Sequence, residues 1–333
     1  MNLKNKKDPF IIAEIGNNHE GSYKLAKKLI NEASKTGVNA VKFQTFQTKD
    51  FISSSDKKRF DRFEKFELST NEFSRLAKFA KKKGLIFIST PLDINSAIFL
   101  NKIVDIFKIS SGDNNYYDLI KTVCSFNKNI IISTGLLNHL EIDKLIKFIK
   151  KIKFPLQKVF FLHCVSSYPV EDLEANLLSI KFLKEKYKIN IGYSDHTLGI
   201  EASIVATALG AQIIEKHFTI DKNFSSFRDH ALSADTPEMM QLVKSVRRVT
   251  KMLGNFEKKI SKSEKKNIHL MRRSIYFKDD ISKNRKILKR DIKIVRPYVQ
   301  VEPNKISKII NKYTKFDQKE NSPVLFKNIK NKK

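Results

Sequence analysis

The sequence predicts an α/β fold: a (β/α)8 or TIM barrel followed by a small β-rich domain. Eight short runs of β-branched and aromatic residues alternate with amphipathic, lysine-rich stretches in the first three quarters of the 333-residue chain. The runs are apolar on both faces, as is typical of parallel strands covered by helices. Eight strand–helix units in succession indicate a barrel. A doubly wound open sheet is the alternative, since the order of elements does not show closure.

Each expected strand is five to seven residues long. The expected strands are FIIAEIG (10–16), AVKFQT (40–45), LIFIST (85–90), DIFKIS (105–110), NIIIST (129–134), KVFFLHC (158–164), NIGYS (190–194) and QIIEKHF (212–218). The clearest helical patterns cover residues 23–37, 71–84, 139–152, 177–187, 200–210 and 236–253. Three of these patterns close on a glycine, which is a common residue at helix C-termini.

We expect the chain to divide into a barrel domain over residues 1–253, a linker over 254–269 and a small domain over 270–333. The linker, GNFEKKISKSEKKNIH, is polar and poor in large apolar side chains. After it come two short strand-like pieces, RSIYFK and IKIVRP, and a short helical pattern, NKISKIINKY. Such a change in composition indicates a separate module.

The chain is strongly basic, with 64 Lys and Arg against 35 Asp and Glu and a formal net charge of +29. This charge raises the hypothesis of a nucleic-acid-binding protein. The lysines are spread along the chain, however, and accompany a general enrichment in Lys, Asn and Ile. No helix-turn-helix, zinc finger or aromatic platform for single strands is evident. We therefore expect no nucleic-acid partner, and a basic surface would instead attract an anionic substrate.

Nothing in the sequence predicts a membrane or secreted protein. No apolar run approaches the roughly 20 residues of a membrane helix, and the first ten residues, MNLKNKKDPF, lack the apolar stretch of a signal peptide. We therefore expect no membrane partner. The two cysteines, Cys124 and Cys164, exclude a disulfide framework and match no zinc-finger spacing. A reducing cytoplasm is the expected location.

Polar side chains gather at the C-terminal ends of the expected strands. They are Glu14, Lys42, Gln44, Ser89, Thr90, Lys108, Ser111, Ser133, Thr134, His163, Ser194, Asp195, His196, Glu215 and His217. In a barrel these ends converge on one face, where active sites are built. A binding module would not need so many ionisable or hydroxylic groups at buried strand ends. The pattern therefore predicts an enzyme.

His196 and His217 fall at the ends of the seventh and eighth expected strands. Two imidazoles there would share one metal ion, because neighbouring strands lie about 4.8 Å apart. Two histidines leave coordination positions open, which suits a catalytic metal. The alternative is that each is a hydrogen-bonded core residue. Glu14, near the end of the first strand, and Asp113, after the fourth, are candidate acid–base groups.

Lys42 and Lys108 interrupt otherwise apolar strands, and lysines are rarely buried unless they are paired or functional. They predict either a Schiff-base nucleophile or a pair of cations for a phosphate and a carboxylate. Neighbouring hydroxyls favour anion binding: Thr90, Ser111, Ser133 and Ser194. The alternative is that one lysine points outward or pairs with a buried carboxylate such as Glu14.

Many segments together resemble one family. They include IIAEIGNNHEGS, FISTPLD, FKISSGDNN, HCVSSYP, IGYSDHTLGIEASIVATALGA and EKHFTIDK. These segments resemble the sialic acid synthases, phosphoenolpyruvate-condensing enzymes that include N-acetylneuraminate, legionaminate and pseudaminate synthases. The resemblance covers roughly residues 10–250 as the barrel. The segment RRSIYFKDDISKNRKILKRDIKIVRP resembles the C-terminal antifreeze-like (SAF) domain of that family.

The resemblance implies a role for each candidate residue. His196 and His217 match metal ligands, most commonly for Mn²⁺, with Mg²⁺ and Co²⁺ as alternatives. The positions that match phosphoenolpyruvate-binding residues are Lys42, Thr90, Lys108, Ser111, Ser133, Ser166 and Ser194. Glu14 and Asp113 are the candidates for proton transfer, and the family usually has Glu at the second position. The positions that match sugar-binding residues are Gln44, Tyr168, Asp229 and Arg296, the last supplied by a partner subunit.

The resemblance also implies the reaction. The expected enzyme is a transferase that condenses phosphoenolpyruvate with an N-acylamino hexose and water to give a nine-carbon 2-keto acid and phosphate. The acceptor would be N-acetylmannosamine or a 2,4-diacetamido-trideoxyhexose, and the enzyme would be a domain-swapped homodimer. A related phosphoenolpyruvate-dependent synthase for another surface polysaccharide sugar is the alternative. Two segments depart from the family pattern, FRDH (227–230) and RPYVQVEP (296–303), and both bear on the choice of sugar.

Overall fold

A computed structural model describes residues 8–332 of the chain. These residues form two compact units, with the boundary after Gly254. The first unit carries the barrel, and the second carries short strands and turns.

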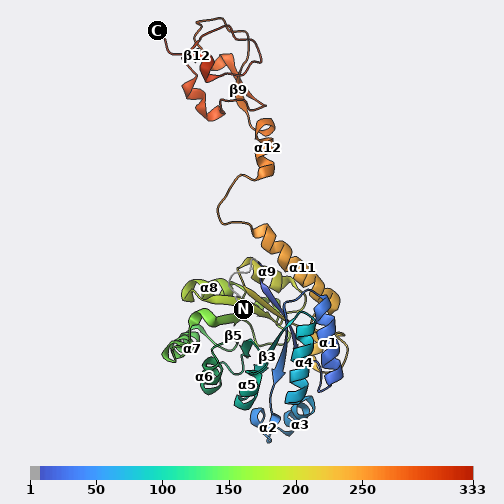
Figure 1. Cartoon of the computed structure of the whole chain (residues 1–333). Coiled ribbons are helices and arrows are strands. Elements are labelled where there is room, and N and C mark those ends of the chain that lie inside the picture. The colour runs from blue at the N-terminus through green and yellow to red at the C-terminus, as the bar shows by residue number, and fades with distance from the viewer. Residues whose placement is uncertain (1–7, 333) are drawn as a thin grey trace. The chain divides into compact units, whose positions relative to one another are not determined.

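The first unit is a closed barrel of eight parallel strands (Figure 1). Each strand pairs with the next along the chain, and β8 pairs with β1 to close the ring. The strands are β1 (Phe10–Gly16), β2 (Ala40–Thr45), β3 (Ile86–Pro91), β4 (Ile106–Ile109), β5 (Asn129–Ser133), β6 (Val159–His163), β7 (Asn190–Asp195) and β8 (Ile213–His217). The predicted barrel is confirmed, and its closure excludes the open sheet.

Helices cover the outside of the barrel (Figure 1). The main ones are α1 (Tyr23–Lys35), α4 (Thr70–Lys82), α5 (Ile94–Leu100), α6 (Tyr117–Ser125), α7 (His139–Lys151), α8 (Leu178–Tyr187), α9 (Glu201–Ala208) and α11 (Thr236–Leu253). Shorter helices are α2 (Thr48–Phe51), α3 (Lys57–Phe66) and α10 (Arg228–Leu232), with 3₁₀ turns at Leu156–Lys158 and Asp172–Glu174. Capping boxes begin α4 and α7, where Ser69 pairs with Glu72 and Asn138 with Glu141.

Helices α5 and α6 lie where the sequence analysis defined no helical pattern. They contain seven and nine residues respectively. An apolar stripe needs two or three turns to repeat, so such short helices carry little periodic signal. Helix α3 was also not predicted, because seven of its ten residues are charged and only Phe66 is buried.

The barrel has two apolar layers. The larger layer packs between the strands and the helices and includes Ile11, Val41 and Tyr193. The smaller layer fills the interior near the strand N-termini and comprises Phe10, Ile12, Ala40, Ile88, Ile106, Ile131, Phe160, Leu162 and Ile213. Strand residues alternate between the two sides, so interior positions recur every second residue.

This alternation places polar groups directly above the inner apolar layer. The interior positions that follow Ile12, Ala40, Ile106, Ile131 and Ile213 by two residues are Glu14, Lys42, Lys108, Ser133 and Glu215. All five are buried. The interior therefore changes from apolar to ionic over a single pair of residues, toward the C-terminal ends of the strands.

The second unit has its own apolar core, formed by residues such as Ile275, Phe277, Ile287 and Val324. Its elements are α12 (Lys262–Met271), β9 (Ser274–Phe277), β10 (Ile292–Val295), β11 (Tyr313–Thr314) and β12 (Ile329–Lys330), with 3₁₀ turns at Lys289–Asp291, Pro303–Lys308 and Phe326–Asn328. The strands pair antiparallel, β9 with β10 and β11 with β12. The predicted small β-rich domain is confirmed.

Two expectations for the second unit need correction. Part of the expected linker, residues 254–269, is helical, because α12 begins inside it at a capping box of Ser261 and Glu264. No residue of α12 is buried, so the helix has no apolar stripe to detect. The expected helix NKISKIINKY is wrong: that segment holds a 3₁₀ turn and the start of β11.

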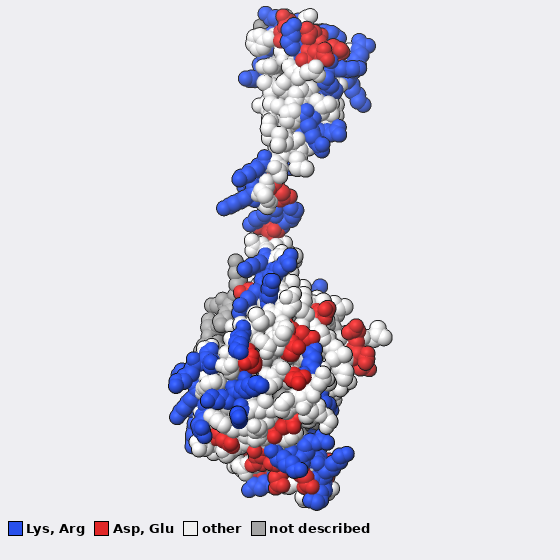
Figure 2. Space-filling model, turned by 90° about the vertical axis from the view of Figure 1, so that its right-hand side faces the viewer, with Lys and Arg blue, Asp and Glu red and all other residues white. Residues whose placement is uncertain are grey.

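Basic side chains are distributed over the visible faces of both units, with acidic side chains among them (Figure 2). Across residues 8–332, no helix is both long and apolar enough to cross a membrane.

Candidate active site

A cavity of about 890 Å³ lies at the C-terminal ends of the barrel strands. Fourteen of the fifteen predicted site residues line it: Glu14, Lys42, Gln44, Thr90, Lys108, Ser111, Asp113, Ser133, Ser166, Tyr168, Ser194, His196, His217 and Asp229. They come from every strand end or the loop that follows it. The predicted convergence of these residues is therefore confirmed, whereas the role of each remains a prediction.

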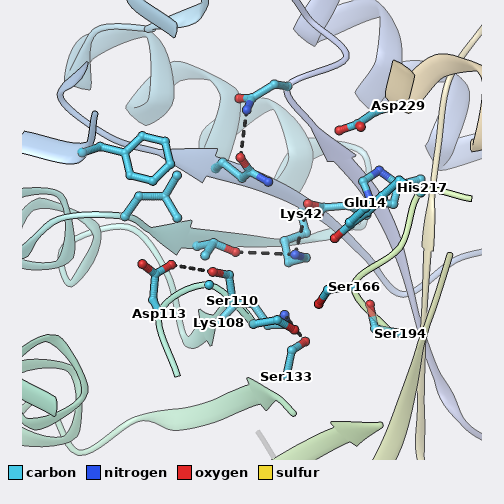
Figure 3. A pocket seen from close by; sticks show the side chains of 18 of the residues that line it. Glu14, Lys42, Lys108, Ser110, Asp113, Ser133, Ser166, Ser194, His217 and Asp229 are labelled. Atoms are coloured by element: carbon cyan, nitrogen blue, oxygen red, sulfur yellow. Dashed lines mark hydrogen bonds and ion pairs between the residues drawn. The ribbon is translucent and has the colours of Figure 1, made fainter. Parts of the chain in front are cut away.

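Four alternating charges form the floor of the cavity. Lys42 Nζ lies 3.1 Å from Glu14 Oε1 and 3.4 Å from Glu215 Oε1. Lys108 Nζ lies 3.6 Å from the same Glu215 oxygen. Figure 3 shows Glu14 and Lys42 side by side in the pocket, with Lys108 beside Ser133. Lys42 therefore does pair with Glu14, as one alternative held, but it still faces the cavity.

The sequence analysis placed Glu215 at a strand end without giving it a role. Its position bridging the two lysines makes it a site residue. Its other contact is a hydrogen bond that Ser194 donates to Oε1, at 2.9 Å. The spacing in the sequence could have indicated this role. Glu215 and His217 are two residues apart on one strand, so both face the interior.

The two carboxylates differ in proton affinity. Burial raises the pKa of Glu14 to about 7, although Lys42 opposes the shift. Burial also acts on Glu215, but Lys108 and Lys42 outweigh it and lower its pKa to about 2. Burial likewise lowers the pKa of Lys108, with Glu215 opposing. Near neutral pH the floor thus holds a full negative charge on Glu215 and a partial one on Glu14, opposite the two lysines.

His196 and His217 form a pair on the opposite side of the cavity from Asp113, and their ring centroids are 5.5 Å apart. Nδ1 of His196 lies 2.7 Å from the Val165 carbonyl. Because a carbonyl accepts, Nδ1 carries the proton and Nε2 keeps its lone pair. Nδ1 of His217 is buried and has no hydrogen-bond partner. Burial lowers the pKa of His196 to about 4 and that of His217 to about 3, so both rings are neutral.

These features fit a divalent metal ion. Two neutral imidazoles with a free nitrogen are good ligands for a metal such as Mn²⁺. Within residues 8–332 there is no cluster of three or more His, Cys, Asp or Glu side chains that could hold a metal. The protein would therefore supply two ligands and leave the other positions to water and substrate oxygens.

Hydroxyl groups form a cradle beside Lys108. Lys108 Nζ donates to Ser133 Oγ at 2.6 Å, and the buried Ser166 Oγ has no partner. A Cβ atom at Gly135 would overlap Ser166 Oγ and Ser111 Oγ and would press on Cys164 Sγ. Glycine is therefore required for these oxygens to converge. Several hydroxyl donors beside an ammonium group suit a phosphate group.

Asp113 lies on the Lys108 side of the cavity, away from His217 (Figure 3). Its Oδ2 accepts a hydrogen bond from Ser110 Oγ at 2.5 Å. Burial raises its pKa, with the Ser110 hydrogen bond and Lys108 opposing. The two acid–base candidates therefore face different parts of the pocket: Glu14 adjoins the histidines, and Asp113 adjoins the cradle.

The mouth of the cavity is formed by the segment 50–63 and by the loop after β8. Arg228 lies over the Tyr168 ring at 4.7 Å, and its Nε is 3.3 Å from Asp229 Oδ1. The FRDH segment, which departs from the family pattern, therefore places the cation of Arg228 at the pocket. The remaining side chains of this wall are Phe51, Arg59, Arg62, Phe63, Leu92 and Phe227. Phe51, Arg59, Arg62 and Phe63 were not predicted, because they lie in the short helices between β2 and β3, several residues beyond the strand end.

Arg296 is the predicted site residue that lies outside the barrel. It belongs to the second unit, where its Nε donates to the Met271 carbonyl at 2.7 Å. Its predicted delivery to the pocket of a partner subunit remains a prediction.

A closed parallel barrel with buried lysines, hydroxyls and a histidine pair at its strand ends is the class of TIM-barrel enzymes that act on small anionic substrates. The chain belongs to the NeuB family, whose model matches residues 29–258. The resemblance seen in the sequence is thereby confirmed.

Individual relatives match nearly the whole chain. It is 38% identical over 328 residues to the N,N'-diacetyllegionaminic acid synthase of Campylobacter jejuni, covering 94% of this chain and 98% of that protein. It is 32% identical over 332 residues to a pseudaminic acid synthase of the same species, covering 96% of both chains. The crystal structure of an N-acetylneuraminic acid synthetase from Leptospira borgpetersenii matches with a TM-score of 0.75 and 36% identity, covering 80% of this chain and 94% of that one.

The cradle yields the first prediction. Gly135→Ala should weaken binding of phosphoenolpyruvate by about 10- to 100-fold, because overpacking costs about 1–3 kcal/mol. Titration calorimetry measures the effect. Gly112→Ala is the matched control, since a Cβ there meets only Ser110 Oγ at an ordinary 3.7 Å. Equal affinities for the two variants would mean that the cradle does not bind the substrate.

The ionisation of Glu14 yields the second prediction. Glu14 keeps its proton below its pKa of about 7 and becomes an anion above it. Affinity for phosphoenolpyruvate should therefore fall as pH rises through neutrality, because the carboxylate repels the substrate and competes for Lys42. Glu14→Gln should flatten this fall in a calorimetric series from about pH 6 to about pH 9. The phosphate ionisation of the substrate is common to both proteins, so identical slopes would exclude Glu14 as the cause.

Proposed function

We propose that this NeuB-family enzyme is a nonulosonic acid synthase, which condenses phosphoenolpyruvate with an open-chain N-acylamino hexose and water to give a nine-carbon 2-keto acid and phosphate. One observation carries the proposal: a single cavity holds two buried lysines and a hydroxyl cradle facing two neutral histidines. The first half suits an anion, and the second would hold a divalent metal ion. The names of the synthases that the chain resembles support the same reaction.

Phosphoenolpyruvate would bind across the cationic half of the pocket. Its phosphate fits the cradle of Ser111, Gly135 and Ser166, and Lys108 adjoins this cradle through Ser133. Its carboxylate would then reach Lys42. Thr90 and Ser194 line the floor between them. This arrangement holds the enol carbon toward the histidines and keeps the anionic groups away from the acceptor.

His196 and His217 would hold a divalent ion, with Mn²⁺ proposed and Mg²⁺ and Co²⁺ as alternatives. When bound, such an ion polarises the aldehyde oxygen of the acceptor. The histidines can bind it near neutral pH because burial keeps both rings unprotonated. Tyr168 packs on the His196 ring, with centroids 4.3 Å apart, and so restricts its orientation.

The bond changes then follow from the arrangement. The enol carbon C3 of phosphoenolpyruvate attacks the aldehyde carbon C1 of the sugar, and water adds at C2 of the enol phosphate. The resulting tetrahedral centre loses phosphate and becomes the keto group. Glu14, beside the histidines, would supply the proton for the former aldehyde oxygen. Asp113, beside the cradle, would accept the proton of the attacking water.

The side chains at the mouth of the pocket bear on which sugar is the acceptor. Phe51, Phe63, Leu92 and Phe227 give it an apolar surface, next to the cations of Arg59 and Arg62. An apolar wall suits a C6 methyl group better than a C6 hydroxyl, because an unpaired hydroxyl is costly to bury. We therefore propose a 2,4-diacetamido-trideoxyhexose rather than N-acetylmannosamine. Gln44, Asp229 and Arg228 would pair with its amide and hydroxyl groups.

The enzyme would act in the cytoplasm as a domain-swapped homodimer, with Arg296 reaching the site of the partner subunit. A reducing compartment is supported by two buried cysteines that form no disulfide.

A phosphate-release assay tests the function. With Mn²⁺ and phosphoenolpyruvate present, the 2,4-diacetamido-trideoxyhexose should release phosphate faster than N-acetylmannosamine or N-acetylmannosamine 6-phosphate. A chelator should abolish release, and added Mn²⁺ should restore it. No release with any of these sugars would reject the proposed reaction. Full turnover in the chelated enzyme would reject the metal role alone.

A truncated chain tests the homodimer. A chain that ends at Gly254 should fold, because the barrel has its own core, but should be nearly inactive if the partner completes the site. Arg296→Ala in the full chain should reproduce the loss, and Arg290→Ala should not. Full activity of the truncated chain would show that the barrel needs no second unit.

A further inference from the structure

A second pair of buried charges lies on the outer side of β7 and β8. Lys216 Nζ is 3.2 Å from Asp195 Oδ2, and both side chains are at most 1% exposed. Neither residue lines the cavity, although their neighbours Ser194, Glu215 and His217 do. This difference follows from strand geometry, since successive side chains point to opposite faces. The pair therefore does not touch the substrates.

The pair lies beside the apolar layer between barrel and helices. Outward residues of the same strands, Ile191 and Ile214, belong to that layer, whereas the direct partners of the pair are hydroxyl and backbone groups. Removing two charges from water is costly, and apolar replacements of a buried ion pair are often equally stable. The fold therefore does not require charges at these two positions, and a role in specifying local geometry accounts for them better than stability does.

Hydrogen bonds fix the pair on several sides. Lys216 Nζ also donates to the Thr197 carbonyl at 2.5 Å. Asp195 Oδ1 accepts from the Thr197 backbone N–H at 2.9 Å and from its hydroxyl at 2.7 Å. Asp195 Oδ2 accepts from Ser203 Oγ of α9 at 2.6 Å. The ammonium and both carboxylate oxygens are thus held by partners, which leaves the pair a single arrangement.

The location of the pair connects it to the histidines. Asp195 and Lys216 are the last residues in register between β7 and β8. His196 follows directly after this point and His217 is the next residue of β8, so ladder pairing no longer holds them together. Lys216 bonds to Asp195 and Thr197, the residues on either side of His196, and precedes His217 in the chain. One side chain thereby ties together the backbone segments that carry both imidazoles.

We propose that Lys216 and Asp195 are positioning residues that set the separation of His196 and His217, and with it the affinity of the pocket for a divalent metal ion. The inference rests on the proposed metal role of the two histidines. The pair acts from outside the cavity by holding two strand ends in register. Supporting interactions of this kind typically change metal affinity by about 10- to 100-fold.

The test uses the full chain and reads metal binding without turnover. Lys216→Met combined with Asp195→Asn removes both charges and leaves neither one buried alone. Mn²⁺ binding is measured from the electron paramagnetic resonance signal of the free ion, and phosphoenolpyruvate binding by calorimetry. We expect Mn²⁺ to bind about 10- to 100-fold more weakly, with phosphoenolpyruvate affinity changed by less than about twofold.

Lys128→Met is the matched control. Lys128 also donates to two backbone carbonyls, those of Asn101 at 2.5 Å and Val104 at 2.7 Å, but it precedes β5 at the opposite end of the barrel. Its loss should leave Mn²⁺ affinity unchanged, even if the protein unfolds at a lower temperature. A purely structural role of Lys216 would likewise lower the unfolding temperature without a selective loss of metal.

Unchanged Mn²⁺ affinity in the folded double variant, or equal losses of Mn²⁺ and phosphoenolpyruvate affinity, would overturn the inference. A wild-type protein that binds no Mn²⁺ would instead reject the metal role in the proposed function. If the double variant does not fold, Ser203→Ala replaces it, since this change keeps the charges paired and removes one hydrogen bond to Asp195. A selective loss of Mn²⁺ affinity in Ser203→Ala supports the inference, and unchanged affinity overturns it.

Discussion

Four buried charges at the floor of the pocket are the constraint on which the site depends. Glu14, Lys42, Glu215 and Lys108 come from four different strands and lie in one chain of ion pairs. A lone charge at this depth would be unstable, because burial penalises the ionised form heavily. Each group is therefore tolerated only because the closed barrel brings the others within reach. The arrangement leaves Glu14 only partly ionised near neutral pH, which reduces the repulsion that an anionic substrate would meet.

The pocket separates two kinds of chemistry over a short distance. On one side, ammonium and hydroxyl groups offer hydrogen-bond donors to an anion. On the other, the rings of His196 and His217 are held neutral by burial and keep nitrogen lone pairs available. Glu14 lies between them and ionises close to neutrality. The same desolvation thus produces a proton carrier and a pair of metal ligands, because it disfavours charge on every group that lacks a partner.

Behind this pocket, a second buried ion pair joins the strands that carry the histidines. The inner and outer ionic groups have different roles. The inner one is exposed to the cavity and can exchange partners with a substrate. The outer one, Asp195 with Lys216, is buried outside the cavity, and both carboxylate oxygens accept hydrogen bonds. An enclosed pair of this kind has one arrangement, which suits it to define geometry rather than to react.

The eight strands and the gathering of polar groups at their ends could be predicted from the sequence, because two-residue alternation and strand-end polarity are local patterns. Ser166, Tyr168 and Asp229 follow from the family resemblance instead, and α5, α6 and α12 were not predicted because short or largely exposed helices carry little periodic signal. The closure of the barrel, the position of Glu215 between Lys42 and Lys108, and the place of Phe51 and Arg59 in the pocket wall are seen in the folded chain alone. Those facts depend on distances between segments far apart in the chain, and such distances are set by barrel closure rather than by any local pattern.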